Sequence, residues 1–165
     1  MIFLTVGTQF PFDRLVKAVD QACDESLVDD EIIAQTGKSS YKPRNFEGTP
    51  FFAKDFFDQN LERATAVIGH AGMGIISLAL DNNKPLLVMP RLKKYNEVVN
   101  NHQLDITKRF GELQHLLFAS DEIEFLEKIK QLKLFIPHPR ENQAEKVSER
   151  IRVFLRLLRQ NHGGE

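Results

Sequence analysis

A run of glycines around a histidine, at residues 69–74, is the stretch of this sequence best suited to chemistry. It reads Gly69-His70-Ala71-Gly72-Met73-Gly74 and stands between a short apolar segment and a longer apolar run. Glycine lets a backbone approach a bound group closely and adopt positive φ angles. A helix that starts directly after such a turn offers unpaired N–H groups to an anion. The stretch therefore predicts a strand-to-helix turn that binds a phosphate.

Common signatures of nucleotide and metal sites do not fit this sequence. A dinucleotide fingerprint needs a third glycine where Ser77 stands, and an acidic residue after the next predicted strand, which instead ends at Arg91. In the segment TGKSS at 36–40, a P-loop would need a glycine at the position of Ile32. The histidines lack metal-site spacing, and no Gly-x-Ser-x-Gly elbow occurs. We therefore predict no metal site and disfavour a nicotinamide or flavin oxidoreductase, a zinc enzyme and a hydrolase.

Short apolar segments alternate with helix-like segments along the chain. Strands are predicted at Ile2–Val6, Asp30–Gln35, Thr49–Ala53, Ala66–Ile68, 84–90 and Gln114–Phe118, and helices at Phe12–Cys23, Asp55–Ala64, about 73–81, Asn100–Arg109, Asp121–Leu132 and Glu141–Arg159. The polar stretch 37–49 is expected to be a functional or mobile loop. This alternation predicts an α/β fold, a Rossmann-like and mainly parallel sheet with helices on both faces.

Three polar or glycine-containing segments follow predicted strands directly. They are Val6-Gly7-Thr8, Gly69-His70 and Met89-Pro90-Arg91. Ligands of open α/β sheets bind outside the carboxyl ends of the strands. We therefore expect these three segments to converge at one edge of the sheet.

Composition limits the class of protein further. The 165 residues suit a single domain, 1–165, and a net charge of −1 gives no sign of a nucleic-acid-binding surface. The lone Cys23 excludes an intrachain disulfide and fits a reducing compartment. No apolar run approaches the ~20 residues that span a bilayer. The expectation is a soluble, cytoplasmic protein.

Three separated motifs in order resemble the nucleotide-sugar-binding half of family 28 glycosyltransferases. They are HAGMG at 70–74, KPLLVMPR at 84–91 and NNHQLD at 100–105. The opening FLTVGTQFPFDRLVKAVD and the segment SSYKP narrow the resemblance to the PssE type, the soluble subunit of two-component transferases for bacterial exopolysaccharides. The likeness is close over residues 2–110 and implies the C-terminal half of a GT-B fold.

The resemblance implies a donor substrate, most simply a UDP-sugar, and no separate cofactor. Its diphosphate would lie at the helix that begins near Met73, where the Ala71, Gly72 and Gly74 backbone allows close approach. His70 would contact the diphosphate or the sugar, the alternative being that it only braces the turn. Gly7 and Thr8 would lie near the sugar and the acceptor, although Gly7 equally suits a tight structural turn.

Further donor contacts follow from the same likeness. Asn101, His102 and Gln103 match a segment whose glutamine suits sugar hydroxyls, while a helix cap by Asn100 or Asn101 is the structural alternative. The backbone of Phe52 and Ala53 would meet the base, although paired aromatics are more often core. Arg91 would add positive charge for a diphosphate. The general base is not assigned: Asp13, His70, His102 and a residue of a partner are the candidates.

Two positions depart from the family pattern. Leu78 stands where a glutamate commonly holds the ribose, and Ile75 where a Thr or Ser often bonds a phosphate. These losses leave open a non-catalytic nucleotide-sugar sensor or scaffold as the alternative function.

A GT-B active site needs two domains, and this chain supplies one. The resemblance implies a membrane-anchored, PssD-like partner subunit that binds a lipid-linked acceptor and holds this chain at the inner face of the membrane. A homodimer is also left open. An amphipathic C-terminal helix over 141–160 is predicted from the helical spacing of Val147, Ile151, Phe154, Leu155 and Leu158, and either clasps the partner or packs on its own sheet.

Overall fold

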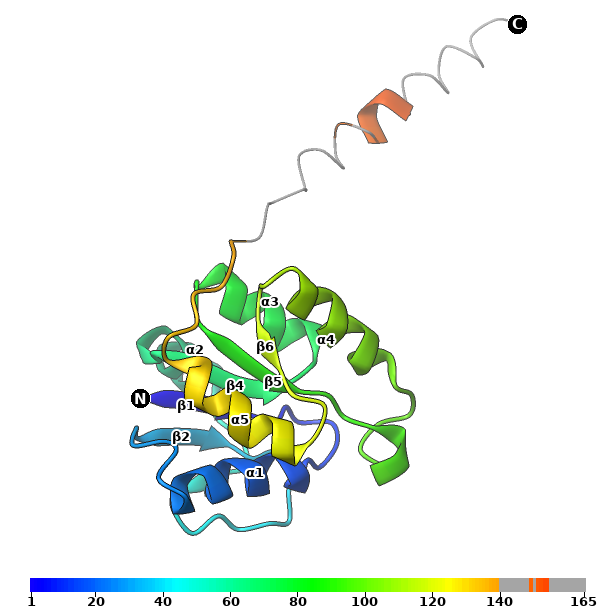
Figure 1. Ribbon diagram of the computed structural model, residues 1–165. Coiled ribbons are helices and arrows are strands. Elements are labelled where there is room, and N and C mark those ends of the chain that lie inside the picture. Colours follow the sequence, from blue (N-terminus) through cyan, green and yellow to red (C-terminus); the bar gives the residue numbers. More distant parts are fainter. Residues whose placement is uncertain (140–148, 150, 155–165) are drawn as a thin grey trace, which may run out of the picture.

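A six-stranded parallel sheet forms the centre of the molecule (Figure 1). The computed structural model describes residues 1–139, 149 and 151–154. The strands are β1 (Ile2–Thr5), β2 (Ile32–Gln35), β3 (Gly48–Thr49), β4 (Ala66–His70), β5 (Leu86–Met89) and β6 (Leu117–Phe118). Their spatial order is β3-β2-β1-β4-β5-β6, and every pair is parallel. The predicted Rossmann-like α/β fold is confirmed.

Helices cover both faces of the sheet. They are α1 (Asp13–Asp24), α2 (Lys54–Arg63), α3 (Met73–Asp81), the 3₁₀ turn η1 (Lys93–Tyr95), α4 (His102–Glu112) and α5 (Glu122–Leu132). In Figure 1, α1 and α5 lie together on the near face. Side chains of α2, α3 and α4 pack on the other face. The central strands β1 and β5 are buried along their whole length because both of their faces are covered, and Thr5 is their only polar residue.

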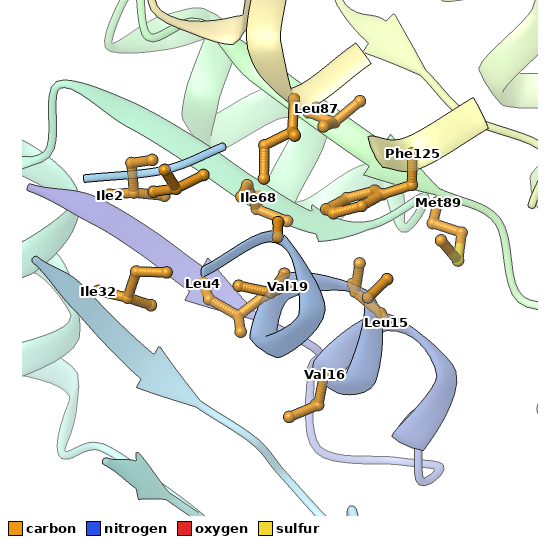
Figure 2. Close-up of a cluster of buried hydrophobic side chains, with 14 of the residues drawn as sticks. Ile2, Leu4, Leu15, Val16, Val19, Ile32, Ile68, Leu87, Met89 and Phe125 are labelled. Carbon is orange, nitrogen blue, oxygen red and sulfur yellow. The ribbon is translucent and has the colours of Figure 1, made fainter. Parts of the chain in front are cut away.

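Alternate residues of each strand feed two separate hydrophobic clusters. Figure 2 shows the first of them, where strand residues Leu4 and Ile68 pack with Leu15 and Val19 of α1 and with Phe125 of α5. Phe3, the neighbour of Leu4, points to the opposite cluster. This period of two explains why a short run such as IFLT can be buried on both sides.

All of the strands and helices predicted before residue 133 occur in the structure, with shifted ends. The third strand is the largest change: it covers only Gly48–Thr49 and not Thr49–Ala53, since Pro50 follows at once. The expected C-terminal helix over 141–160 lies mostly outside the described residues. Of that segment, Glu149 and residues 151–154 are helical, and the side chains of Ile151 and Phe154 are exposed.

Two carboxylates on one face of α1 anchor the polar stretch 37–49, which was expected to be a functional or mobile loop. Asp13 accepts hydrogen bonds from the N–H groups of Ser40 and Tyr41. Two turns later, the buried Asp20 accepts from the Tyr41 hydroxyl at 2.6 Å, from the Arg44 and Asn45 N–H groups, and from the Asn45 amide. Since each donor is a group of the loop, α1 fixes the path of the loop.

We predict that Asp20→Ala lowers the free energy of unfolding by about 2–3 kcal/mol, because four hydrogen bonds from the loop to this buried carboxylate are lost. Urea denaturation measures the change. Asp24→Ala is the control, since the ion pair of Asp24 with Arg44 is exposed and is worth at most about 1 kcal/mol. Equal losses in the two variants would contradict the anchoring role of Asp20.

Candidate functional site

The order of the strands places the switch point of the sheet between the carboxyl ends of β1 and β4, where doubly wound folds form a ligand-binding crevice. The chain runs outward from β1 to β3 on one side and then restarts at β4 on the other side of β1. Thr5 pairs with Gly69 in the sheet, and His70 pairs with Met89. The segments that follow β1, β4 and β5 therefore begin at the same edge of the sheet, as predicted. Doubly wound folds bind ligands at this switch point.

The imidazole of His70 lies against two glycines in this crevice. A Cβ atom on Gly7 would stand 2.9 Å from Cε1 of His70, and one on Gly72 would stand 2.3 Å from Nε2. Gly7 also has a φ of +73°, which other residues rarely adopt. The structure therefore agrees with the structural alternatives for both residues. Gly7 makes a tight turn, and His70 packs between the loop after β1 and the loop after β4.

The surroundings of His70 keep its side chain neutral. Burial lowers its pKa from 6.5 to about 4, with a further contribution from the positive charge of Arg91. Its Nδ1 atom is buried and has no hydrogen-bond partner in the described part of the chain. A neutral imidazole has one donor and one acceptor nitrogen, so it can bond a hydroxyl or a phosphate oxygen without carrying charge.

The amino end of α3 opens directly beside His70. Gly72 is the extended residue before the helix, with φ −86° and ψ 137°, and its carbonyl accepts from the Ile76 N–H. By helix geometry, the N–H groups of the first turn before Ile76 have no intrahelical partner. No atom lies within 4 Å of a Cβ built on Gly74. The turn therefore presents backbone donors next to open space, which suits an anion.

Arg91 is turned into the fold, where it was expected to face a diphosphate. Its side chain is only 3% exposed, and its guanidinium donates to the carbonyls of Val6 and Phe10, the latter at 2.8 Å. The guanidinium also lies 5.2 Å above the centre of the Phe12 ring. Burial lowers the pKa of Arg91 to about 10, so that it stays charged at neutral pH. Arg91 braces the β1–α1 loop.

The polar residues around the start of α4 hold the loop after β5. Gln103 Oε1 accepts from the Arg91 N–H at 3.0 Å, and Asn101 Oδ1 accepts from the Lys93 N–H at 2.9 Å. Asn100 Oδ1 accepts from the His102 N–H, which agrees with the structural alternative of a polar cap by Asn100. The amide nitrogen of Gln103 makes none of these bonds and remains a donor for a ligand.

A buried ion pair, which no pattern in the sequence indicated, ties the same loop to α1. Arg14 donates from Nε and Nη2 to the two carboxylate oxygens of Glu97, both at 3.0 Å, and from Nη2 to the Pro90 carbonyl at 2.9 Å. Glu97 also accepts from the Leu92 N–H. Arg14 and Glu97 are 83 positions apart. Only the folded chain brings them together, so no local pattern could have signalled the pair.

Other predicted site residues take mixed positions. The Phe52 N–H donates to Gln35 Oε1 at 2.9 Å, and its ring packs on Phe3, so Phe52 is largely core. Ala53 is exposed at the start of α2, Thr8 is exposed after Gly7, and Ala71 is buried. Among the candidate bases, His102 is exposed. Although partial burial opposes ionisation of Asp13, hydrogen bonds from Ser40 and Tyr41 hold the pKa of its carboxyl below the ordinary value. A lowered pKa disfavours Asp13 as a base.

Neither a metal cluster nor a membrane span is found in the described part of the chain. No group of three or more His, Cys, Asp or Glu side chains there has the arrangement of a metal site. No helix within residues 1–139, 149 and 151–154 is long and apolar enough to cross a bilayer.

Comparison with known proteins agrees with this geometry. The profile of the glycosyltransferase family 28 C-terminal domain matches residues 1–157. The chain belongs to this family. Human UDP-N-acetylglucosamine transferase subunit ALG13 is 32% identical over an alignment of 128 residues. The alignment covers 72% of this chain and 11% of the human protein. The subunit of the same name from Yarrowia lipolytica is 25% identical over 94% of this chain and 86% of its own length.

A solved structure supports the fold of this family 28 domain. The solution NMR structure of ALG13 superposes with a TM-score of 0.60 at 23% identity, over 87% of this chain and 91% of that one. The match to human ALG13, by contrast, spans only about a tenth of the human protein.

We predict that His70 makes stability depend on pH between 4 and 6.5. In this range the unfolded chain binds the proton of His70 and the native domain does not. Stability therefore falls on acidification from pH 6.5 towards 4, by up to about 1.4 kcal/mol per pH unit from this group. Urea denaturation at several pH values should show the slope in wild type and in the exposed-site control His138→Gln, and a smaller slope in His70→Gln. A slope in His70→Gln equal to that of wild type would contradict the assignment of this pH dependence to His70.

We also predict that Glu97→Ala destabilises the domain by about 2–4 kcal/mol, because it leaves the buried Arg14 with only the partly exposed carboxylate of Glu122, at 3.5 Å. Chemical denaturation measures the loss. The double variant Arg14→Met, Glu97→Leu should lose less than Glu97→Ala alone, since no buried charge is stranded. A loss below about 1 kcal/mol in Glu97→Ala would show that the pair behaves as an exposed one.

Proposed function

We propose that this family 28 domain is the donor-binding subunit of a two-component glycosyltransferase. It binds a UDP-sugar, and the sugar passes to a lipid-linked acceptor held by a membrane-anchored second subunit. The observation that carries the proposal is the open amino end of α3 beside the neutral His70, at the switch point of the sheet. Family membership and the subunit names of the relatives support it.

The donor would be held mainly by backbone groups. Its diphosphate would accept hydrogen bonds from the N–H groups of the first turn of α3, with Gly72 and Gly74 allowing the approach. His70 would bond the diphosphate or the sugar, and the free amide nitrogen of Gln103 would bond a sugar hydroxyl. UDP is the substrate's own leaving group, so this scheme needs no separate cofactor.

Transfer would break the bond between the anomeric carbon and the diphosphate and join that carbon to an acceptor hydroxyl oxygen. The helix terminus would stabilise the negative charge that develops on the departing UDP. The acceptor hydroxyl would lose its proton to a base. Because the low pKa of Asp13 makes it a weak base, we place this role on His102 or on the partner subunit.

The identity of the sugar follows from the relatives alone. Human and Yarrowia lipolytica ALG13 are named as subunits of a UDP-N-acetylglucosamine transferase, so UDP-N-acetylglucosamine is the first donor to test. The motifs at 3–20 and 39–43 underlie the narrower proposal of exopolysaccharide synthesis with a PssD-like partner.

Exposed apolar side chains around the crevice support a second subunit. Phe51 follows β3, Met73 follows β4, and Tyr95 and Val99 follow β5; Phe51 and Val99 are 67% and 73% exposed. All four lie after the carboxyl end of a strand, on the side of the sheet where the donor would sit. A partner that completes a GT-B cleft would cover them, and would hold this single domain at the membrane.

A non-catalytic nucleotide-sugar sensor or scaffold is the second candidate. Leu78 is 40% exposed on α3, where the family commonly has a ribose-binding glutamate, and Ile75 is buried. This alternative predicts donor binding without sugar transfer, even when the partner is present.

We predict that Gly74→Asp weakens binding of UDP-N-acetylglucosamine about tenfold or more, because it puts a negative charge beside the diphosphate. Isothermal titration calorimetry measures the affinity. Gly74→Asn, of equal size and without charge, should bind within about twofold of Gly74→Ala, since open space surrounds this position.

Two results would contradict the donor site at α3. One is equal affinity of Gly74→Asp and Gly74→Asn, which would put the phosphates elsewhere. The other is that wild type binds none of UDP, UDP-glucose, UDP-galactose and UDP-N-acetylglucosamine, alone or with the partner subunit present.

A further inference from the structure

The outer edge of β2 is only partly covered by its neighbour. β3 has two residues and pairs with Ala34 and Gln35, so Ile32 and Ile33 have no strand beside them on this side within the described residues. Glu31 O accepts from the Ile2 N–H, which directs the backbone of Ile32 away from β1. The N–H and C=O of Ile32 thus face outward, and an uncovered strand edge is a template for another strand.

A groove of about 440 Å³ runs along this uncovered edge. Phe46, Phe52 and Phe56 line it, and Phe56 is 49% exposed. The rings of Phe52 and Phe56 meet edge to face, with 5.0 Å between their centres. The groove therefore combines backbone hydrogen-bonding groups with an aromatic wall that can hold apolar side chains.

The charged side chains that line the groove are all acidic. They are Asp30, Glu31 and Glu47, and no basic side chain of the described residues lines it. Asp30 is paired with Lys133 at 2.7 Å, which leaves Glu31 and Glu47 as exposed carboxylates. An occupant therefore has to carry positive charge next to apolar side chains.

We propose that this groove binds an extended segment of another protein, with alternating basic and apolar residues, as an added strand beside β2. In such strand addition, main-chain hydrogen bonds give affinity and alternate side chains give specificity. The apolar side chains would lie on Phe46, on the face of the sheet that α1 covers, and the basic ones would reach Glu31 and Glu47. The groove shares Phe52 with the predicted donor contacts, but its strand edge lies on the outer side of β2, away from the switch point between β1 and β4.

Charge and conformation favour this occupant over two others. A second copy of the chain would bring Glu31 and Glu47 against their own counterparts, and like charges at close range oppose association. The chain's own segment 151–154 is helical and so does not offer an extended strand. A basic, extended segment of a partner satisfies both the charge and the backbone edge.

The test uses the full chain and the synthetic peptide acetyl-KVKVKVK-amide as the probe. Cys23, the single cysteine, lines the groove and reports on its occupancy. We expect the peptide to shift the amide NMR signal of Ile32 and to slow the reaction of Cys23 with a thiol reagent at least threefold. The double variant Glu31→Lys, Glu47→Lys should bind at least tenfold more weakly. Glu127→Lys, on the exposed face of α5, makes a charge reversal away from the groove and should leave binding unchanged.

Several results would overturn the proposal. Equal binding of acetyl-EVEVEVE-amide would remove the charge argument, and equal binding of the proline peptide acetyl-KPKPKPK-amide would exclude strand addition. No effect of the probe at Ile32 and Cys23 would place it elsewhere. A dimer in sedimentation that is lost in Phe56→Ala would make a second copy the occupant. None of these readouts depends on UDP-sugar binding. Failure of the proposed donor site and failure of the proposed peptide groove can therefore be told apart.

Discussion

The fit of one imidazole between two residues that lack a Cβ atom is the constraint on which the rest of this site depends. His70 leaves no space for a side chain at Gly7 or Gly72, where a Cβ would come within 3 Å of the ring. Its position locks the loop after β1 to the loop after β4, across the switch point of the sheet. Gly72 also belongs to the turn that the diphosphate would approach in the proposed function. At this position the packing of His70 and the proposed binding would both require a residue without a Cβ atom.

Buried charge extends this arrangement towards α1 and α4. Arg14 has a carboxylate partner in Glu97, which together with Glu122 raises its pKa against the effect of burial. Arg91 donates mainly to carbonyl groups, and burial lowers its pKa to about 10. Arg91 still carries its charge at neutral pH, and this charge is one reason why His70 does not. A positive group that is turned into the fold thus adds to the effect of burial in keeping the imidazole at the proposed donor site neutral.

The sequence was sufficient for the fold and for the convergence of the segments after β1, β4 and β5 at one edge of the sheet, because both rest on local patterns. A short strand such as 66–70 that begins with apolar residues and leads through a glycine-containing turn into a helix carries its own signal. The roles of polar residues were less accessible. Arg91 and Gln103 look like ligand-binding residues in the sequence, but they bond to backbone groups of neighbouring loops. The contacts of Arg14 with Glu97, and of Asp20 with 41–45, depend on segments that meet only in the folded chain.

Most polar side chains near the proposed site hydrogen-bond to the backbone of loops, and few are left to bind a ligand. Asp13, Asn101 and the oxygen of Gln103 are occupied by the backbone of neighbouring loops. What remains beside the crevice is the first turn of α3, the neutral His70 and the amide nitrogen of Gln103, none of which carries a full charge. Leu78 adds no carboxylate on the same helix. Such a set can hold an anion through dipoles, but it offers no evident strong base, and a group that removes a proton has to come from His102 or from outside this domain.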